Sequence, residues 1–181
     1  RQALSQSLLW MTAKGSPDQS LKNICSYALQ ALGALQGCVV ILDESAQINQ
    51  IITMHEQKAK ANLPHEFPIP LRALKEEAYR ACRVVYHNDF NTRQEYEHEQ
   101  RPVSECFNNL ENILFAPVTI NGRVQALICM TNKPGGFTPY DAELAESFST
   151  IIAANLYIQQ LQHNLSFSEQ QHVLQGNQLF S

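Results

Sequence analysis

The sequence predicts an α+β domain, in which an antiparallel sheet carries helices on both faces and is followed by a long C-terminal helix. Three observations predict it. Two segments with apolar residues at helical spacing precede the first apolar strands. An Asn-Gly pair separates two later strands, and no helix breaker lies between Pro139 and Gly176. At 181 residues, the chain is long enough for one domain with a sizeable core and flanking helices.

Two helices are predicted before the first strand. Leu4 and Leu8 share one face of a short helix that ends before Pro17. A second helix, with Asp18 or Ser20 as its N-cap, then keeps apolar residues at helical spacing over four turns.

The first strands follow from two apolar patterns. Residues 38–42 are apolar at consecutive positions, as expected of a strand that is covered on both faces. Residues 47–55 alternate and are predicted to be the hairpin partner of that strand. After a proline-rich connection, Pro70 leads a third helix, which includes Cys82 among its apolar positions, and residues 84–86 form a short strand.

The clearest local signal is a hairpin between residues 113–118 and 124–130. The two apolar segments flank Asn121-Gly122, a pair that favours a type I′ turn because both residues tolerate positive φ. The polar stretch from His87 to Asn109 is longer than a plain connector, and segments of that length in compact domains are commonly functional or locally helical.

The last helix is predicted to begin at Pro139, with Thr138 as N-cap and Asp141 in its first turn. Apolar residues then recur every seven positions, at Leu144, Ile151, Ile158 and Leu165. About three heptads are marginal for a free coiled coil but sufficient for a signalling helix that its domain steadies.

Composition excludes several classes of protein. A net charge of −4 gives no electrostatic reason to expect nucleic acid or direct contact with an anionic membrane, and no apolar run approaches the roughly 20 residues that span a bilayer. The five cysteines include no Cys-x-x-Cys pair, which suits a reducing compartment, and we expect a cytoplasmic protein. Because the chain begins at Arg1, we interpret it as a fragment of a longer one.

Motifs across residues 18–162 resemble the GAF family, and most closely bacterial GAF domains of sensor kinases and cyclic-di-nucleotide enzymes. The resemblance is carried by Ala116-Pro117-Val118, Asn121-Gly122-Arg123-Val124, residues 131–138 (Thr-Asn-Lys-Pro-Gly-Gly-Phe-Thr) with Asp141, and residues 84–90 (Val-Val-Tyr-His-Asn-Asp-Phe). It implies a six-stranded antiparallel sheet and a homodimer formed through the first and last helices. We therefore expect an N-terminal helix and linker over 1–17, a sensory domain over 18–162, and a signalling helix over 163–181 that leads to an absent output domain.

One part of the resemblance is a pattern shared by some GAF domains that bind cyclic nucleotides. Asn132, Lys133, Phe137 and Asp141 fit this pattern, but Ala142 stands where those relatives have Glu. The role we assign is structural. A Lys133–Asp141 ion pair holds the loop before the long helix in place, and the negative charge of Asp141 stabilises the N-terminus of that helix. The pattern supports the fold rather than a cyclic nucleotide ligand.

The family also implies a small-molecule pocket between one sheet face and the irregular segments over it. Carried onto this chain, its lining is Tyr86, Asp89, Phe90, Arg93, Phe107, Leu110 and Thr131. In this interpretation Arg93 meets an anionic group of the ligand, and aromatic rings stack on a planar one. The alternative is that the apolar members simply fill a core beneath an empty lid. No particular cofactor is indicated.

Cys106 lies close to the position at which bilin-binding relatives attach their pigment. Those relatives usually follow the cysteine with His, whereas Phe107 stands here, and Glu105 beside it raises rather than lowers a thiol pKa. These observations favour an unreactive or weakly redox-sensitive cysteine.

The polar stretch and the helices show no signature of metal binding or catalysis. His87, Asp89, Glu95, Glu97, His98 and Glu99 have no zinc spacing, and the segment after Asp89 fails as a calcium loop, so we expect a solvated segment and no metal. The sequence also has no Gly-x-Ser-x-Gly, Walker or kinase motif, and no catalytic residue is predicted.

Three functions remain open at this point. The first is a non-catalytic sensory module that binds an unidentified small molecule and signals through its terminal helices in a homodimer. The second is a ligand-free dimerisation module, with an interface formed by Leu4, Leu8, Ile151, Ile158 and Leu165. The third is a photoreceptor with a bilin on Cys106.

Overall fold

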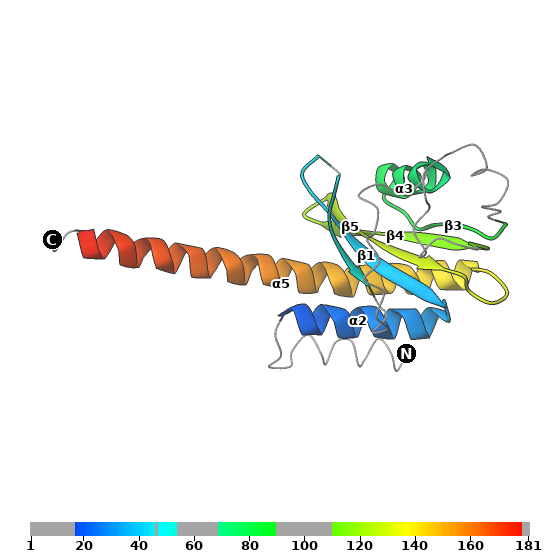
Figure 1. Cartoon of the computed structure of the whole chain (residues 1–181), viewed down its shortest axis with the longest axis horizontal. Coiled ribbons are helices and arrows are strands. Elements are labelled where there is room, and N and C mark those ends of the chain that lie inside the picture. Colours follow the sequence, from blue (N-terminus) through cyan, green and yellow to red (C-terminus); the bar gives the residue numbers. More distant parts are fainter. Residues whose placement is uncertain (1–16, 46, 54–68, 90–109, 179–181) are drawn as a thin grey trace.

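The structure is a computed structural model that describes residues 17–45, 47–53, 69–89 and 110–178. In chain order its elements are α2 (Pro17–Leu32), β1 (Gln36–Leu42), β2 (Ile48–Thr53), α3 (Ile69–Ala81), β3 (Val85–His87), β4 (Ile113–Ile120), β5 (Arg123–Thr131) and α5 (Pro139–Gln178). Figure 1 shows a sheet with α3 on one side and α2 and α5 on the other. The predicted α+β class with a long C-terminal helix is confirmed.

The sheet is antiparallel throughout, with the strand order β2-β1-β5-β4-β3. The described residues form five strands, and the sixth that the resemblance implies is not among them. The predicted hairpin joins β4 to β5, with φ of 50° at Asn121 and 76° at Gly122. Both central residues have positive φ, as a type I′ turn requires.

Neighbouring residues of the central strands face two separate cores. On β1, Val39 belongs to the core under α2 and α5, whereas Val40 belongs to the core under α3. Ile128 and Leu127 divide in the same way on β5. The consecutive apolar residues in the sequence therefore reflect a sheet that is covered on both faces.

Helix α5 has a buried part and an exposed part. Apolar residues from Ala145 to Leu156 belong to the core shared with α2 and the sheet. From Tyr157 onward the described side chains are exposed except Gln159, which is half-buried. At 1.5 Å per residue, the 22 residues from 157 to 178 form a helical segment roughly 30 Å long. Figure 1 shows this end of α5 running out past the sheet and α2.

Some boundaries differ from the sequence prediction. Helix α3 ends at Ala81, and Cys82 lies beyond it with φ of 48°, exposed rather than on an apolar helix face. A residue in the left-handed region commonly ends a helix, and here it turns the chain toward β3. The C-terminal helix passes through Gly176 to Gln178. The predicted helix containing Leu4 and Leu8 lies outside the described residues.

Candidate functional site

The loop between β5 and α5 is held by an N-cap that the sequence predicted. The backbone N–H of Asp141 donates to Thr138 Oγ1 over 3.3 Å, and the N–H of Thr138 donates to Asp141 Oδ2 over 2.8 Å. This reciprocal pairing is a capping box, in which two otherwise unpaired N–H groups of the first turn obtain acceptors. The start of α5 is therefore fixed by Thr138 and Asp141 together.

The predicted ion pair ties that cap to the last strand. Lys133 Nζ lies 2.6 Å from Asp141 Oδ1, and the two side chains are 21% and 5% exposed. Burial raises the pKa of Asp141, but hydrogen bonds from Lys133 and Thr138 outweigh this effect and hold the pKa below its usual value. The carboxylate is therefore charged at neutral pH and contributes most to stability in that form.

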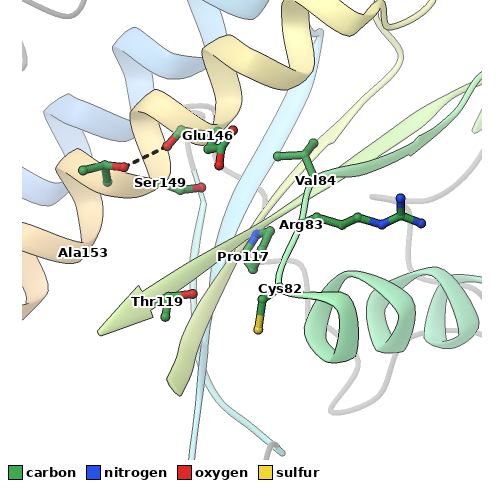
Figure 2. A pocket seen from close by; sticks show the side chains of 9 residues that line it. Cys82, Arg83, Val84, Pro117, Thr119, Glu146, Ser149 and Ala153 are labelled. Atoms are coloured by element: carbon green, nitrogen blue, oxygen red, sulfur yellow. Dashed lines mark hydrogen bonds between the residues drawn. The ribbon is translucent and has the colours of Figure 1, made fainter. Parts of the chain in front are cut away.

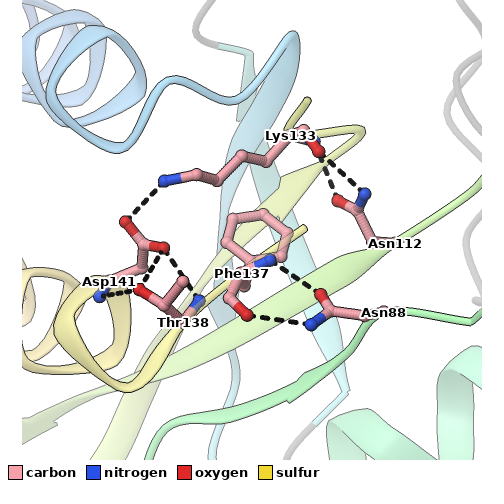
Figure 3. Close-up of polar contacts among 6 residues, drawn as sticks. All are labelled: Asn88, Asn112, Lys133, Phe137, Thr138 and Asp141. Atoms are coloured by element: carbon pink, nitrogen blue, oxygen red, sulfur yellow. Dashed lines mark hydrogen bonds and ion pairs between the residues drawn. The ribbon is translucent and has the colours of Figure 1, made fainter. Parts of the chain in front are cut away.

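Two asparagine side chains hold the same loop from neighbouring segments (Figure 3). Asn88, directly after β3, accepts from the N–H of Phe137 over 2.7 Å and donates to the Phe137 carbonyl over 2.9 Å. Asn112, directly before β4, accepts from the N–H of Lys133 over 2.8 Å and donates to its carbonyl over 2.9 Å. Each amide side chain pairs with both the backbone N–H and the carbonyl of one residue, as a neighbouring strand would.

We call Asn88, Asn112, Lys133, Phe137, Thr138 and Asp141 the loop clamp. Its six residues join β3, β4 and β5 to the first turn of α5. The sequence interpretation assigned no role to Asn88 or Asn112. Their signal was faint: each asparagine directly flanks a strand, where an amide side chain can replace a backbone partner.

Gly136 fits the clamp closely. Its φ is 79°, and a Cβ built on it would lie 2.8 Å from Cγ of Asn88. A side chain at this position would meet both an unfavourable backbone conformation and the amide that holds Phe137. The adjacent Gly135 has a similar φ of 80° but no atom within 4 Å of such a Cβ.

The structure divides the predicted pocket residues between the two sheet faces. Leu110 belongs to the core under α3, and Thr131 pairs across the strands with Ile113 of the same core. Tyr86 instead packs against the core under α2 and α5, because it alternates with Val85 on β3. The expectation that Tyr86 and Leu110 line one cavity is therefore wrong.

The other predicted pocket residues are placed only in part. Asp89 is exposed, and the hydroxyl of Thr131 is 3.5 Å from Oε1 of Gln36, within the sheet. Phe90, Arg93 and Phe107 lie outside the described residues, as do Cys106 and four of the six candidate metal ligands. Among the residues that are described, no group of three His, Cys, Asp or Glu is placed to hold a metal ion.

The residues predicted to form the dimer interface differ in their exposure. Ile151 is 8% exposed and packs in the core of its own domain, so it is not available to a partner and its assignment to the interface is wrong. Ile158 and Leu165 are 40% and 65% exposed, on the part of α5 that leaves the domain. Leu4 and Leu8 lie outside the described part of the chain.

The described cysteines are free thiols in two environments. Cys25 is buried, and burial raises its pKa to about 12. Cys38 and Cys129 are direct cross-strand neighbours between β1 and β5, and the contact with Cys38 together with burial raises the pKa of Cys129. Cys82 is exposed. No helix in the described part of the chain is both long and apolar enough to cross a bilayer.

Comparison with known proteins places this geometry in a family. The family described as "GAF domain" matches residues 15–156. No curated protein sequence matches the chain.

Solved structures share the fold at low sequence identity. A bacteriophytochrome from R. palustris matches with a TM-score of 0.64 and 10% identity, over 97% of this chain and 40% of its own. The GAF domain of a putative sensor histidine kinase from Pseudomonas syringae pv. tomato matches with a TM-score of 0.58 and 14% identity, over 92% and 90% of the two chains. Free methionine-R-sulfoxide reductase from Neisseria meningitidis matches with a TM-score of 0.60 and 13% identity, over 84% and 85%.

These three proteins share one fold but have different functions, so the structural similarity shows the fold of this chain and not its activity. The family match is more direct, because it covers α2, the whole described sheet and the buried part of α5. The chain belongs to the GAF domain family.

Proposed function

We propose that the chain is a regulatory domain of a bacterial signalling protein, without catalysis of its own. It binds a small molecule over the α3 face of the sheet and passes the signal to α5 in a cytoplasmic homodimer. The observation that carries this proposal is the pair of hydrogen bonds between Asn88 and Phe137, at 2.7 and 2.9 Å. They connect the end of β3 to the residue just before the cap of α5.

The proposed ligand face is the one on which Leu110, Thr131 and Val85 lie. Leu110 is the first described residue after segment 90–109, and Asp89 is the last one before it. A ligand that contacts this segment therefore acts on the chain at a position adjacent to Asn88. We therefore place the ligand on the α3 face near Leu110 and Asp89, and not at the full set of pocket residues predicted from the sequence, which lie on both faces of the sheet.

The loop clamp provides a short mechanical route from that face to α5. A displacement of Asn88 changes the position of the Phe137 peptide, and Phe137 precedes the N-cap Thr138. Lys133 and Asn112 hold the other side of the loop to β5 and β4. A ligand shifts the helix only as far as it binds the two loop arrangements with different affinity.

A second candidate function, dimerisation without a ligand, is favoured by an exposed apolar stripe on α5. Ile158, Leu161 and Leu165 follow one another at three- and four-residue spacing and are 40%, 45% and 65% exposed. Residues at this spacing share one face of a helix, as in a coiled-coil seam. We define these three residues as the α5 stripe.

Ligand binding separates the two candidates. Native mass spectrometry of the freshly purified protein identifies a retained small molecule, and thermal unfolding with that compound measures its effect. We expect Arg93→Ala to abolish the stabilisation, and the matched control Arg123→Ala, at the exposed end of the β4–β5 hairpin, to retain it. A protein that retains no compound, or equal stabilisation of both variants, contradicts the sensory proposal and leaves dimerisation.

Both candidate functions require a dimer, and the oligomeric state of variants tests whether the α5 stripe forms its interface. We expect Leu161→Glu to convert a dimer into a monomer in sedimentation equilibrium, because the charge would be buried in the seam. Gln162→Glu adds the same charge at the next exposed position and serves as the control. If Leu161→Glu leaves the dimer intact, the stripe is not the interface.

A further inference from the structure

Cys38 and Cys129 face each other across two central strands of the sheet. They are direct partners in the pairing of β1 with β5, and both side chains belong to the core under α3. The two thiols are in contact, and this contact together with burial raises the pKa of Cys129. The pair therefore lies on the sheet face to which we assign the ligand.

The other described thiols lie apart from this pair. Cys25 is on α2 and belongs to the core on the opposite face of the sheet. Cys82 lies in the turn between α3 and β3, and it borders the same hollow as Pro117 of β4 at the edge of the sheet (Figure 2). Among the described cysteines, Cys38 and Cys129 are therefore the two that are placed to form a disulfide with each other.

The backbone register indicates how close the two Cα atoms lie. The carbonyl of Thr131 accepts from the N–H of Leu35 over 3.2 Å, so it points toward β1. Backbone groups repeat their direction at every second residue of a strand, and those of Cys129 therefore also point toward β1. Cys38 and Cys129 are thus a hydrogen-bonded pair, whose Cα atoms lie about 5.5 Å apart, within the roughly 4.4–6.8 Å that disulfides span.

A disulfide at this position strains the sheet. Opposite residues of antiparallel strands have Cβ atoms roughly 4.5–5.5 Å apart, with hydrogen-bonded pairs toward the upper limit, whereas a disulfide requires about 3.8 Å. Bond formation therefore draws the two strands together by roughly 1 Å at this point. Strained disulfides are easier to reduce than relaxed ones, so cellular thiols can reverse the bond.

We propose that Cys38 and Cys129 form a reversible disulfide in response to peroxide, and that this bond alters the loop clamp. Cys38 is 8% exposed and Cys129 is 1% exposed, so the oxidant reaches Cys38 first. One peroxide oxygen is transferred to Cys38 Sγ, which becomes a sulfenic acid, and the other oxygen leaves as water. The Cys129 thiol attacks that sulfur, the S–S bond forms, and the hydroxyl leaves with the thiol proton as a second water. Two electrons pass from the two thiols to hydrogen peroxide.

Burial makes this reaction slow. A buried thiol with a raised pKa is seldom a thiolate at neutral pH, and the thiolate is the reactive form. The pair therefore responds to prolonged exposure to peroxide and not to a brief pulse.

Strand β5 connects the disulfide to the loop clamp. Cys129 lies two residues before the end of β5 at Thr131, and Lys133 of the clamp follows directly after that end. A displacement of β5 at Cys129 therefore moves the attachment point of Lys133. Formation of the bond is independent of the proposed ligand, whereas its effect on α5 rests on the proposed signalling function.

The test uses the full chain with Cys25→Ala, Cys82→Ser and Cys106→Ser, which retains only Cys38 and Cys129. After hours in dilute hydrogen peroxide, catalase removes the oxidant, and the protein is unfolded, alkylated and weighed by mass spectrometry. We expect a product two mass units lighter that takes up no alkyl group, and uptake of two alkyl groups after treatment with reduced glutathione. Two alkyl groups without that treatment, or a disulfide that glutathione does not reduce, overturn the proposal.

The wild-type chain keeps the test decisive if the triple variant folds poorly. Chymotrypsin cuts at Tyr27, between Cys25 and Cys38, so a digest without reduction identifies which cysteines are joined. We expect a linked peptide pair that contains Cys38 and Cys129. Its absence after peroxide treatment overturns the proposal.

A matched control and a spectrum separate the disulfide from its effect. A chain that retains only Cys25 and Cys38, on opposite faces of the sheet, should form no disulfide; one that forms equally well contradicts the assigned geometry. In the ¹⁵N-labelled chain that retains Cys38 and Cys129, oxidation should shift the amide signals of Lys133 and Phe137. A disulfide that leaves both signals unchanged overturns the switch but not the proposed ligand site, which the thermal unfolding experiment tests.

Discussion

Replacing Asn88 with Ala removes the link between β3 and the start of α5. The substitution deletes two hydrogen bonds at once and leaves the backbone N–H and the carbonyl of Phe137 without their partner. Phe137 is 2% exposed, but Asn88 itself lies at the surface, so water can reach part of the space that the amide leaves. A buried group left unpaired costs about 1–3 kcal/mol, and because water replaces part of the amide we expect a loss of roughly 1–2 kcal/mol in the free energy of unfolding.

Urea denaturation measures this loss. With a slope of about 2 kcal/mol/M for a domain of this size, the midpoint should fall by roughly 0.5–1 M. Asn164→Ala, on the exposed part of α5, is the matched control and should stay within about 0.5 kcal/mol of the wild type. A loss below about 0.5 kcal/mol for Asn88→Ala would show that the two hydrogen bonds do not hold the loop.

Three further predictions address the loop clamp and the thiols. Gly136→Ala should destabilise more than Gly135→Ala, because both have φ near 80° but only the first places a Cβ 2.8 Å from Asn88; equal effects in urea melts would contradict the close fit. The pKa of Asp141 is lowered on folding, so its contribution to stability is present above the usual aspartate value of 3.8 and is lost as pH falls through the folded pKa. Asp141→Asn should therefore cost about 2 kcal/mol at pH 7 and progressively less in acid; a deficit that is independent of pH refutes this. In a Cys106→Ser background, Cys82 should react rapidly with a thiol reagent while Cys25, Cys38 and Cys129 stay protected in the folded state; more than one fast thiol would argue against their burial.

The sequence predicted those parts of the fold that depend on local chemistry. Asn121-Gly122 predicted the hairpin because two adjacent residues with positive φ suit few other turns. Thr138 and Asp141 predicted the helix start, and the proposed Lys133–Asp141 pair is present at 2.6 Å. In each case the interacting residues lie within eight positions of one another, so spacing alone constrains their geometry.

The errors came from contacts between distant segments. Asn88 and Phe137 are 49 positions apart, and no periodicity relates them. The face on which Tyr86 lies was missed because a one-residue shift in pairing register reverses the side chains of a strand, and no local pattern shows that Tyr86 pairs with Leu114. Ile151 fits the same seven-residue repeat as the exposed Ile158 and Leu165, although it packs in the domain core. The repeat alone does not show where that core ends along the helix.

The claim that the loop clamp sets the position of α5 is tested most directly by a distance between the two helices of a dimer. A spin label on Asn164→Cys, in a Cys82→Ser and Cys106→Ser background, reports that distance by pulsed electron spin resonance. We predict one narrow distribution that Asn88→Ala broadens or shifts, because the start of the helix loses one of its attachments to the sheet. Identical distributions with and without Asn88, or no dipolar signal between protomers, would contradict the claim.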